Sequence, residues 1–428
     1  MTERAAGSGS ASASASASAS ASASGSESGS ESESESGSGS GSESGPESGS
    51  ESGSESGPES GPESGPESES GSGLAEVEAA AAKLARRFRG QAEACLQLGS
   101  PLYSALSLRA AESIADRGPI WDVVSPMADL PGGAMLTLRF LGATHRLALA
   151  GQAPALAAHY PSCGGDGDAA AAWAALVDLC QSSPEAVTEL LDRGVQTNEV
   201  GRAAALLPGF LAVAASTGLP LRLLEVGASG GLNLRWDHFR YAGWGPASSQ
   251  VDQGDPWSGG PRPELSPAWS PQLVASRRGC DVAPIDPSSS DGRLTLLSFV
   301  WPDMARRFAL LDGACAVAAS VGAPVDQASA DDWLSAHLAS PEAGLATVVY
   351  HSVMLQYLSP SVRSRLLATI ASAGAAATRA APLAWLRLEP IGGDLAGDME
   401  VRLTTWPGAE DRRLAIAHPH GTWVRWEA

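Results

Sequence analysis

Long apolar segments are missing from this sequence. No run of about 18 apolar residues occurs, and no apolar stretch follows a basic leader at the N-terminus. The sequence therefore predicts neither a membrane-spanning helix nor export, and we expect a cytoplasmic protein. Cysteine is also scarce, because the five cysteines are far apart and form no Cys-x-x-Cys pair. This spacing predicts neither a zinc site nor a disulfide framework.

Acidic residues outnumber basic residues in this sequence. The chain has 28 Lys and Arg against 48 Asp and Glu, a net charge of −20 at pH 7. The first 73 residues hold 13 Glu and one Arg, so the rest of the chain carries only about −8. No long basic stripe is present, which argues against general nucleic-acid binding through phosphate contacts. We expect a small-molecule substrate rather than a macromolecular one.

Residues 1–73 are almost wholly Ser, Gly, Ala and Glu, in repeats such as Ser-Glu-Ser-Gly. This composition offers too little apolar surface to offset the entropy that a chain loses on ordering. We therefore expect a disordered tail over residues 1–73.

Residues 74–195 follow a helical pattern and are expected to form a helical N-terminal domain. Strong helix formers and an apolar stripe fill residues 74–89, and Gly90 is the expected end of that helix. Residues 135–141 fit a strand or a helix, and their helical neighbours favour a helix. Further helices are expected at 101–116, 169–180 and 184–191.

Strands and helices alternate in residues 196–428. A buried helix over 203–217 precedes a short apolar strand at 221–226. Further strands are expected at 280–285, 323–326, 346–350 and 383–388, with antiparallel edge strands at 400–405, 413–417 and 422–426. Helical patterns fill 293–318, with a break at Trp301, and 360–375. Such alternation predicts an α/β fold with a Rossmann-like, doubly wound, mostly parallel sheet, into which residues 242–271 form an insertion.

The most informative stretch is residues 221–234, LRLLEVGASGGLNL. An apolar strand ends in an acidic residue, a turn of Gly, Ser and Ala follows, and the apolar pattern of a helix resumes. Glycines let the backbone approach a ligand closely, and a helix start directs free N–H groups toward it. Ligands of doubly wound sheets bind at the carboxyl ends of the strands. Polar residues expected at those ends are Glu225, Asp286, Asp331, Asp332, His351 and Glu389.

Two chemistries use such a loop, and a ligand-free turn is the third interpretation. Glu225, Gly227, Ser229 and Gly231 match the acidic-x-Gly-x-Gly-x-Gly loop of class I S-adenosylmethionine methyltransferases, with serine in place of the middle glycine. Residues 227–231 also match Gly-x-Ser-x-Gly, the nucleophile elbow of α/β-hydrolases. An α/β-hydrolase would use Ser229 as nucleophile, with Asp332 or Asp394 and then His418 or His420 completing the triad. A noncatalytic, ligand-binding Rossmann-like protein remains the other alternative.

Four segments resemble a bacterial family of uncharacterised proteins, the domain of unknown function numbered 2332. They are residues 196–202, 224–234, 350–353 and 385–389, and the likeness covers most of residues 75–428. The polar cluster at 196–202 has two interpretations: Asn198 caps the next helix, or Asn198 and Arg202 reach toward the carboxylate of a cofactor or toward the substrate.

The resemblance, through its methyltransferase-like core, implies S-adenosylmethionine as cofactor. Gly227, Ser229 and Gly231 would surround its methionine part, and Glu225 would organise the loop or accept from the cofactor's amino group. Asn233, in the same loop, and Arg202 would also contact the cofactor.

The same resemblance assigns the later strand ends. Asp286 would take the ribose hydroxyls, and Asp331 or Asp332 would reach the adenine amino group. His351 would lie beside the methyl donor and orient or deprotonate an unidentified acceptor, which makes it the expected catalytic residue.

Overall fold

The computed structural model describes residues 69–131, 135–393 and 395–428, all within one compact unit. Residues 1–68, most of the predicted tail, lie outside the described part. The first helix, α1 (Glu69–Gln97), begins inside the stretch expected to be disordered. It also continues through Gly90, where we expected it to end. A side chain at Gly90 would meet no atom within 4 Å, so this glycine lies on an open surface and interrupts no packing.

Helices fill the chain as far as Leu191. After α1 come α2 (Pro101–Ala115), α3 (Pro119–Val124), η1 (Ser125–Met127), α4 (Leu136–Leu149), α5 (Pro154–Ala157), η3 (Pro161–Cys163), α6 (Ala169–Ser182) and α7 (Pro184–Leu191). The ambiguous segment at 135–141 is thus helical. Apolar side chains of these helices form a common buried core, which Trp301 joins from the later part of the chain.

The sheet has eight strands in the order β3-β2-β1-β4-β5-β6-β7-β8. Neighbours among β1 to β5 pair in parallel, and β6, β7 and β8 are antiparallel, as expected. The strands are β1 (Leu221–Val226), β2 (Val274–Asp281), β3 (Val325–Gln327), β4 (Ala346–Ser352), β5 (Leu383–Pro390), β6 (Met399–Trp406), β7 (Glu410–Ala417) and β8 (Val424–Trp426). The structure is therefore a mixed α/β fold with antiparallel C-terminal strands.

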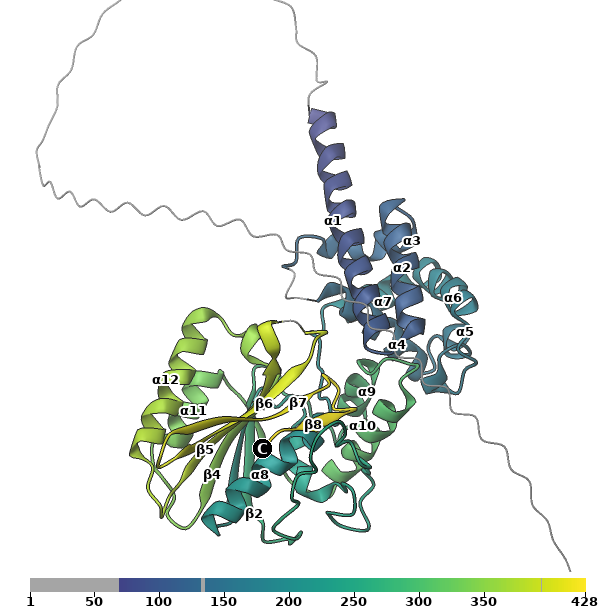
Figure 1. Cartoon of the computed structure of the whole chain (residues 1–428). Coiled ribbons are helices and arrows are strands. Elements are labelled where there is room, and N and C mark those ends of the chain that lie inside the picture. The colour runs from purple at the N-terminus through teal and green to yellow at the C-terminus, as the bar shows by residue number, and fades with distance from the viewer. Residues whose placement is uncertain (1–68, 132–134, 394) are drawn as a thin grey trace, which may run out of the picture. The chain divides into compact units, whose positions relative to one another are not determined.

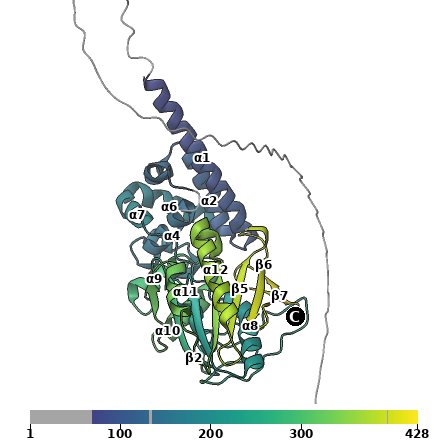
Figure 2. The ribbon, with the colours of Figure 1, turned by 90° about the vertical axis from the view of Figure 1, so that its left-hand side faces the viewer.

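Helices cover both faces of this sheet (Figure 1). The apolar residues of β1 divide between two cores: Leu221 and Leu223 belong to one, Leu224 and Val226 to the other. The first core contains α8 (Arg202–Thr217), η4 (Leu232–His238), α9 (Ser290–Ser298) and α10 (Ala305–Ala318), and the second contains α11 (Ala330–Leu338) and α12 (Pro360–Ala376). In Figure 2, α12 lies in front of the sheet. Burial on both faces explains why β1 is apolar along most of its length.

The second strand lies earlier than its apolar pattern suggested. We expected a strand over 280–285 that ends at Asp286, whereas β2 covers Val274–Asp281. This strand contains two arginines, Arg277 and Arg278, which form ion pairs with Asp237 and Asp326. Because these pairs satisfy charged side chains along the strand, β2 lacks the apolar signature of a buried strand. The acidic residue that ends it is Asp281.

The insertion at 242–271 contains no helix or extended strand. Trp244 and Trp257 are each 6% exposed and belong to the core that contains α8. The indole of Trp244 donates to the carbonyl of Pro267 at 3.0 Å, and Trp257 forms an isolated bridge with Val424. These tryptophans therefore fasten the insertion to the body of the protein.

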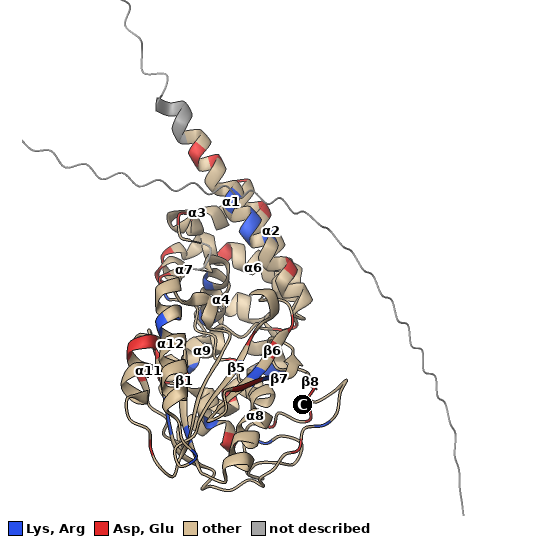
Figure 3. Ribbon diagram, turned by 60° about the vertical axis from the view of Figure 1, so that its left-hand side comes forward, with Lys and Arg blue, Asp and Glu red and all other residues tan. Residues whose placement is uncertain are grey.

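Charged residues of both signs are interspersed over the described elements in the view of Figure 3. No helix in the described ranges combines the length and apolar character needed to cross a membrane.

Candidate functional site

A cavity of about 940 Å³ opens at the carboxyl ends of β1 to β4. The sheet contributes Asp281, the last residue of β2, and residues that follow the other three strands, including Gly227, Ala328 and Val353. The opposite wall comes from the helical part of the chain, chiefly α1 and α4. A cavity of this size is at the upper end of the range for small-molecule sites.

The loop after β1 has an unusual backbone. Gly227, Ser229 and Gly231 all have positive φ, at 68°, 52° and 63°. Glycine adopts this conformation freely, whereas Ser229 carries some strain. A Cβ at Gly227 would lie 3.1 Å from Cβ of Met354, and one at Gly231 would lie 2.7 Å from Val325. Backbone geometry and packing therefore account for both glycines even without a ligand.

Residues 196–202 hold this loop in place through three hydrogen bonds. The hydroxyl of Ser229 donates to Gln196 Oε1 at 2.7 Å, and the N–H of Leu232 donates to Asn198 Oδ1 at 2.9 Å. The side-chain amide of Asn233 donates to the carbonyl of Glu199 at 3.2 Å. Two sequence segments that carry the family resemblance are thus one structural unit.

This unit corrects two expectations. Asn198 does not cap α8, since Gly201 is the N-cap residue and Asn198 accepts from the loop instead. Asn233 is 2% exposed and does not line the cavity, so its side chain supports the loop rather than facing a ligand.

Asp281 occupies the position that we expected for Asp286. Its Oδ2 accepts from the backbone N–H of Ser229 at 2.9 Å, and Oδ1 accepts from the N–H of Ala283 at 3.0 Å. The carboxylate lines the cavity, and Val282 beside it is 72% exposed. Asp281 is the functional candidate that sequence reasoning missed, because the end of β2 was placed five residues too late.

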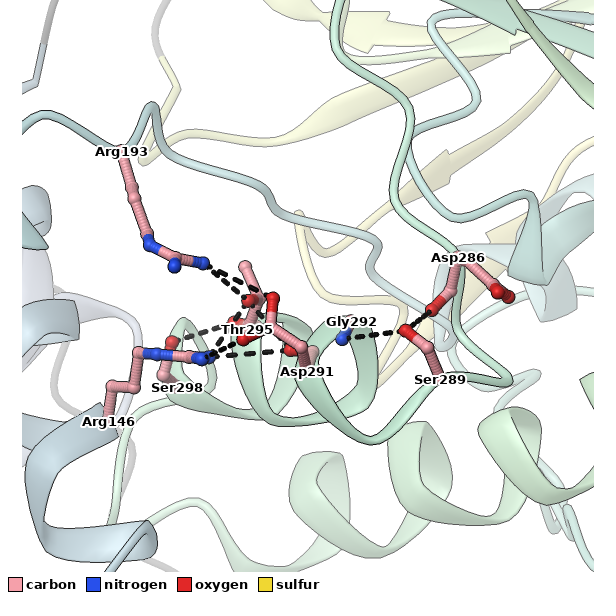
Figure 4. A network of polar contacts seen from close by, with 8 residues as sticks. All are labelled: Arg146, Arg193, Asp286, Ser289, Asp291, Gly292, Thr295 and Ser298. Atoms are coloured by element: carbon pink, nitrogen blue, oxygen red, sulfur yellow. Dashed lines mark hydrogen bonds and ion pairs between the residues drawn. The ribbon is translucent and has the colours of Figure 1, made fainter.

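Asp286 and Asp332 lie outside the cavity lining. Oδ1 of Asp286 accepts from both the N–H and the hydroxyl of Ser288, just before α9. The carbonyl of Asp286 accepts from the hydroxyl of Ser289 (Figure 4). Asp332 accepts from the hydroxyl of Ser329 at 3.0 Å in the first turn of α11. Both therefore have local roles at the starts of helices.

Asp291 and Asp331 form ion pairs that hold parts of the structure together. Asp291 of α9 pairs with Arg146 of α4 and with Arg193, which joins the helical part to the sheet part (Figure 4). Asp331 is buried and pairs with Arg365 at 2.6 Å. Neither aspartate lines the cavity.

Glu225 is buried within β1 and does not line the cavity. The hydroxyl of Tyr350 on β4 donates to its Oε2 at 3.2 Å. Burial raises the pKa of Glu225 to about 8, although Tyr350 and Arg235 act in the opposite direction. A carboxyl group in this environment holds its proton at neutral pH.

His351 is fully buried on β4, and both ring nitrogens have partners. Nδ1 lies 2.7 Å from Glu389 Oε1, and Nε2 accepts from the indole of Trp385 at 3.0 Å. His351 is not part of the cavity lining. Glu389, which also accepts from the N–H of Met354, ties His351 to the loop that covers Gly227.

Arg202 faces the cavity from the first turn of α8. Its Nε donates to the carbonyl of Pro419 at 3.0 Å, and Nη1 donates to that of Ser352 at 3.3 Å. No carboxylate of the described chain forms an ion pair with it. Arg307, by contrast, is paired with Glu199 at 2.6 Å. An arginine bonded only to carbonyls retains its positive charge for an anionic group of a ligand.

A Ser-His-Asp triad is not assembled in the described residues. The hydroxyl of Ser229 is hydrogen-bonded to Gln196, and no hydrogen bond joins it to a histidine among the described residues. His420 lines the cavity, but burial lowers its pKa most, and the charged groups that lower it further are Arg307, His418 and Arg202, with no acid among them. Asp332 is engaged at the start of α11, and Asp394 lies outside the described residues.

The helical wall of the cavity could not be anticipated from sequence motifs. It includes Gln91 and Gln97 of α1, together with Leu138 and Arg139 of α4. These residues belong to ordinary amphipathic helices, and only the tertiary arrangement brings them to the edge of the sheet.

Comparison with known proteins identifies the family. A family described as "Uncharacterized protein conserved in bacteria (DUF2332)" has a model that matches residues 85–426, and the chain belongs to this family. No curated protein and no solved structure matches the chain. The family resemblance seen in the sequence is confirmed, and the family description names no activity.

Proposed function

We propose that this protein is an S-adenosylmethionine-dependent methyltransferase that acts on a small molecule. One observation carries the proposal: a single cavity contains the loop after β1, the acid that ends β2, and Arg202. The enclosing wall of α1 and α4 favours a small molecule over a macromolecule as acceptor.

The strand order supports a nucleotide-type ligand. Strands β3-β2-β1-β4-β5 are parallel. From β1 the chain continues to β2 and β3 on one side of the sheet, and from β4 it continues to β5 on the other side. This order is typical of doubly wound, Rossmann-like sheets, whose ligands bind where the order reverses, at the carboxyl ends of the strands. The cavity lies at that place.

The residues present fit the parts of S-adenosylmethionine. Asp281 offers carboxylate oxygens to the ribose hydroxyls, beside the close turn at Gly227–Gly231. The exposed side chain of Val282 offers an apolar surface to the adenine ring. Arg202 offers its charge to the carboxylate of the methionine part, as the sequence suggested.

The bound cofactor would supply an activated methyl group on a sulfonium sulfur. The protein's contribution is to hold acceptor and donor at attack distance and to exclude water, which can itself provide a large acceleration. His351 has no part in this step, because its nitrogens are engaged elsewhere.

Calorimetric titration of the full chain with S-adenosylhomocysteine tests the proposal. Saturable binding is expected, and Arg202→Gln should weaken it because the ligand carboxylate loses its cation. An absence of binding heat at millimolar ligand, in protein with a cooperative melting transition, would contradict the assignment.

A further inference from the structure

The cavity contains a histidine that the proposed cofactor contacts do not use. His420 follows β7, is 8% exposed and lines the cavity. Its Nδ1 is buried without a hydrogen-bond partner, and Nε2 donates to no residue in the described ranges. Most buried polar side-chain atoms have a partner, so an unpartnered imidazole in a cavity wall is a candidate ligand-binding group.

The buried nitrogen also determines which group faces the ligand. Burying an N–H without an acceptor is rarer than burying a bare acceptor atom. Nδ1 of His420 is therefore the bare nitrogen of the neutral ring, and Nε2 carries the hydrogen. His420 presents a hydrogen-bond donor to the cavity, which suits an oxygen acceptor on the ligand.

The surroundings of His420 are positive on one side and aromatic on the other. The ring of Trp301 meets that of His420 edge to face, with centroids 5.5 Å apart, and the guanidinium of Arg307 lies 5.5 Å from the Trp301 ring. Arg307 and Arg202 both lower the pKa of His420, after the larger effect of burial. Glu199 forms an ion pair with Arg307, and its charge also acts on Arg202.

We propose that His420 binds a carboxylate of the methyl acceptor, so that the acceptor is a small carboxylic acid seated against Trp301. The description of this ligand as an acceptor rests on the proposed methyltransferase function. The Nε2–H of His420 donates to the carboxylate in a charge-assisted hydrogen bond. His420 is thus a binding residue for the acceptor, distinct from the cofactor contacts at Asp281 and Arg202.

A carboxylate fits this site better than a phosphate does. The two arginines whose charge acts on His420 are both engaged: Arg307 is paired with Glu199, and the proposed function assigns Arg202 to the carboxylate of the cofactor. A dianion at His420 would therefore lack the compensation that a buried double charge requires. The nearby wall is largely apolar, with Phe299, Trp301 and Leu98 in the lining. A small organic acid with an apolar body matches both properties.

Histidine NMR on the full chain tests this proposal with a defined probe. Protein labelled with ¹³C at histidine Cε1 is titrated with benzoate, with the neutral isostere benzamide, and with inorganic phosphate. His420→Gln assigns the His420 signal, and His159, which pairs with Asp166 near the surface, serves as the internal control.

Benzoate should shift the His420 signal and raise its pKa, with proton affinity about tenfold higher at saturation, because the bound anion stabilises the imidazolium. Benzamide, phosphate and the His159 signal should show no comparable change. His420→Gln should weaken benzoate binding about tenfold or more, the loss expected for a charge-assisted hydrogen bond. An unchanged His420 signal with benzoate, or equal shifts with benzamide or phosphate, would overturn the proposal.

The outcome is separable from that of the proposed function. Binding of S-adenosylhomocysteine with no effect of benzoate on His420 would leave the cofactor assignment standing and remove the acceptor site. A benzoate response without S-adenosylhomocysteine binding would support the carboxylate site and remove the methyltransferase assignment.

Discussion

The carboxylate of Asp281 accepts a hydrogen bond from the backbone N–H of Ser229 at 2.9 Å. This contact joins the end of β2 to the glycine-rich loop after β1, across 52 residues of sequence. The end of β2 and the glycine-rich loop, the two elements most relevant to a nucleotide-type ligand, are thereby a single structural unit.

Ser229 tests the choice between methyltransferase and hydrolase. Ser229→Gly relieves the strain of a positive φ, which stabilises the fold, but it also removes the hydrogen bond to Gln196, which destabilises it. Because the two effects oppose each other, the free energy of unfolding should change by less than about 1 kcal/mol. Ser229→Ala keeps the strain and loses the bond, and should be less stable than Ser229→Gly in urea unfolding.

S-adenosylhomocysteine binding should survive in Ser229→Gly, because the hydroxyl serves the loop and not the ligand. Covalent labelling of Ser229 by a fluorophosphonate probe, with Ser229→Gly as the unlabelled control, would instead support the hydrolase interpretation.

His351 should prove structural. His351→Phe leaves the Glu389 carboxylate and the Trp385 N–H without their partner, at a cost of about 2–4 kcal/mol in unfolding free energy. Urea unfolding of this variant beside His159→Phe, at a more exposed histidine, measures the difference. A His351→Phe protein with normal stability would contradict this assignment.

Glu225 should make stability depend on pH. Its pKa is about 8 in the folded chain against an ordinary value of 4.5. Between these values the folded chain keeps a proton that the unfolded chain releases, so stability is highest below pH 4.5 and falls as the pH rises toward 8. Glu225→Gln removes this dependence. When the pH rises from 5 to 8, the unfolding free energy of the variant should therefore increase by about 2–4 kcal/mol relative to that of the native chain.

Urea unfolding at the two pH values measures that gain, and Glu410→Gln, at an exposed position, is the matched control. Parallel pH profiles for native protein and Glu225→Gln would show that the buried carboxyl ionises normally.

The N-terminal repeats should be dispensable for folding. Their composition provides almost no apolar surface, so a chain that starts at Pro66 and keeps the whole of α1 should melt within about 2 °C of the full chain, as expected for a change of a few tenths of a kcal/mol. A fall of several degrees in the melting midpoint would show that the repeats pack on the body.

Periodicity located most elements of the fold, because buried strands and amphipathic helices have distinct apolar patterns. It failed at β2, where Arg277 and Arg278 are satisfied by Asp237 and Asp326, contacts that no local pattern reveals. Periodicity also predicted that α1 ends at Gly90, whereas the helix continues to Gln97 and places Cys95 in the buried core. Glycine is a weak stop signal when its position is exposed.

The candidate site was only partly predictable for a similar reason. The loop at Gly227–Gly231 and the position of Arg202 could be inferred from local sequence. The identity of Asp281 depended on the exact end of β2, and the role of His351 depended on partners from β5. The wall formed by α1 and α4, and the unpartnered ring of His420, exist only in the folded chain.

The most direct test of the account compares two aspartates in one calorimetric titration with S-adenosylhomocysteine. Asp281→Asn should weaken binding by about 1–3 kcal/mol, because the amide replaces one acceptor oxygen offered to the ribose. Asp286→Asn, with its side chain at the start of α9, should bind like the native protein. Equal affinities for native protein and a folded Asp281→Asn variant, or no binding heat at millimolar ligand, would contradict the account.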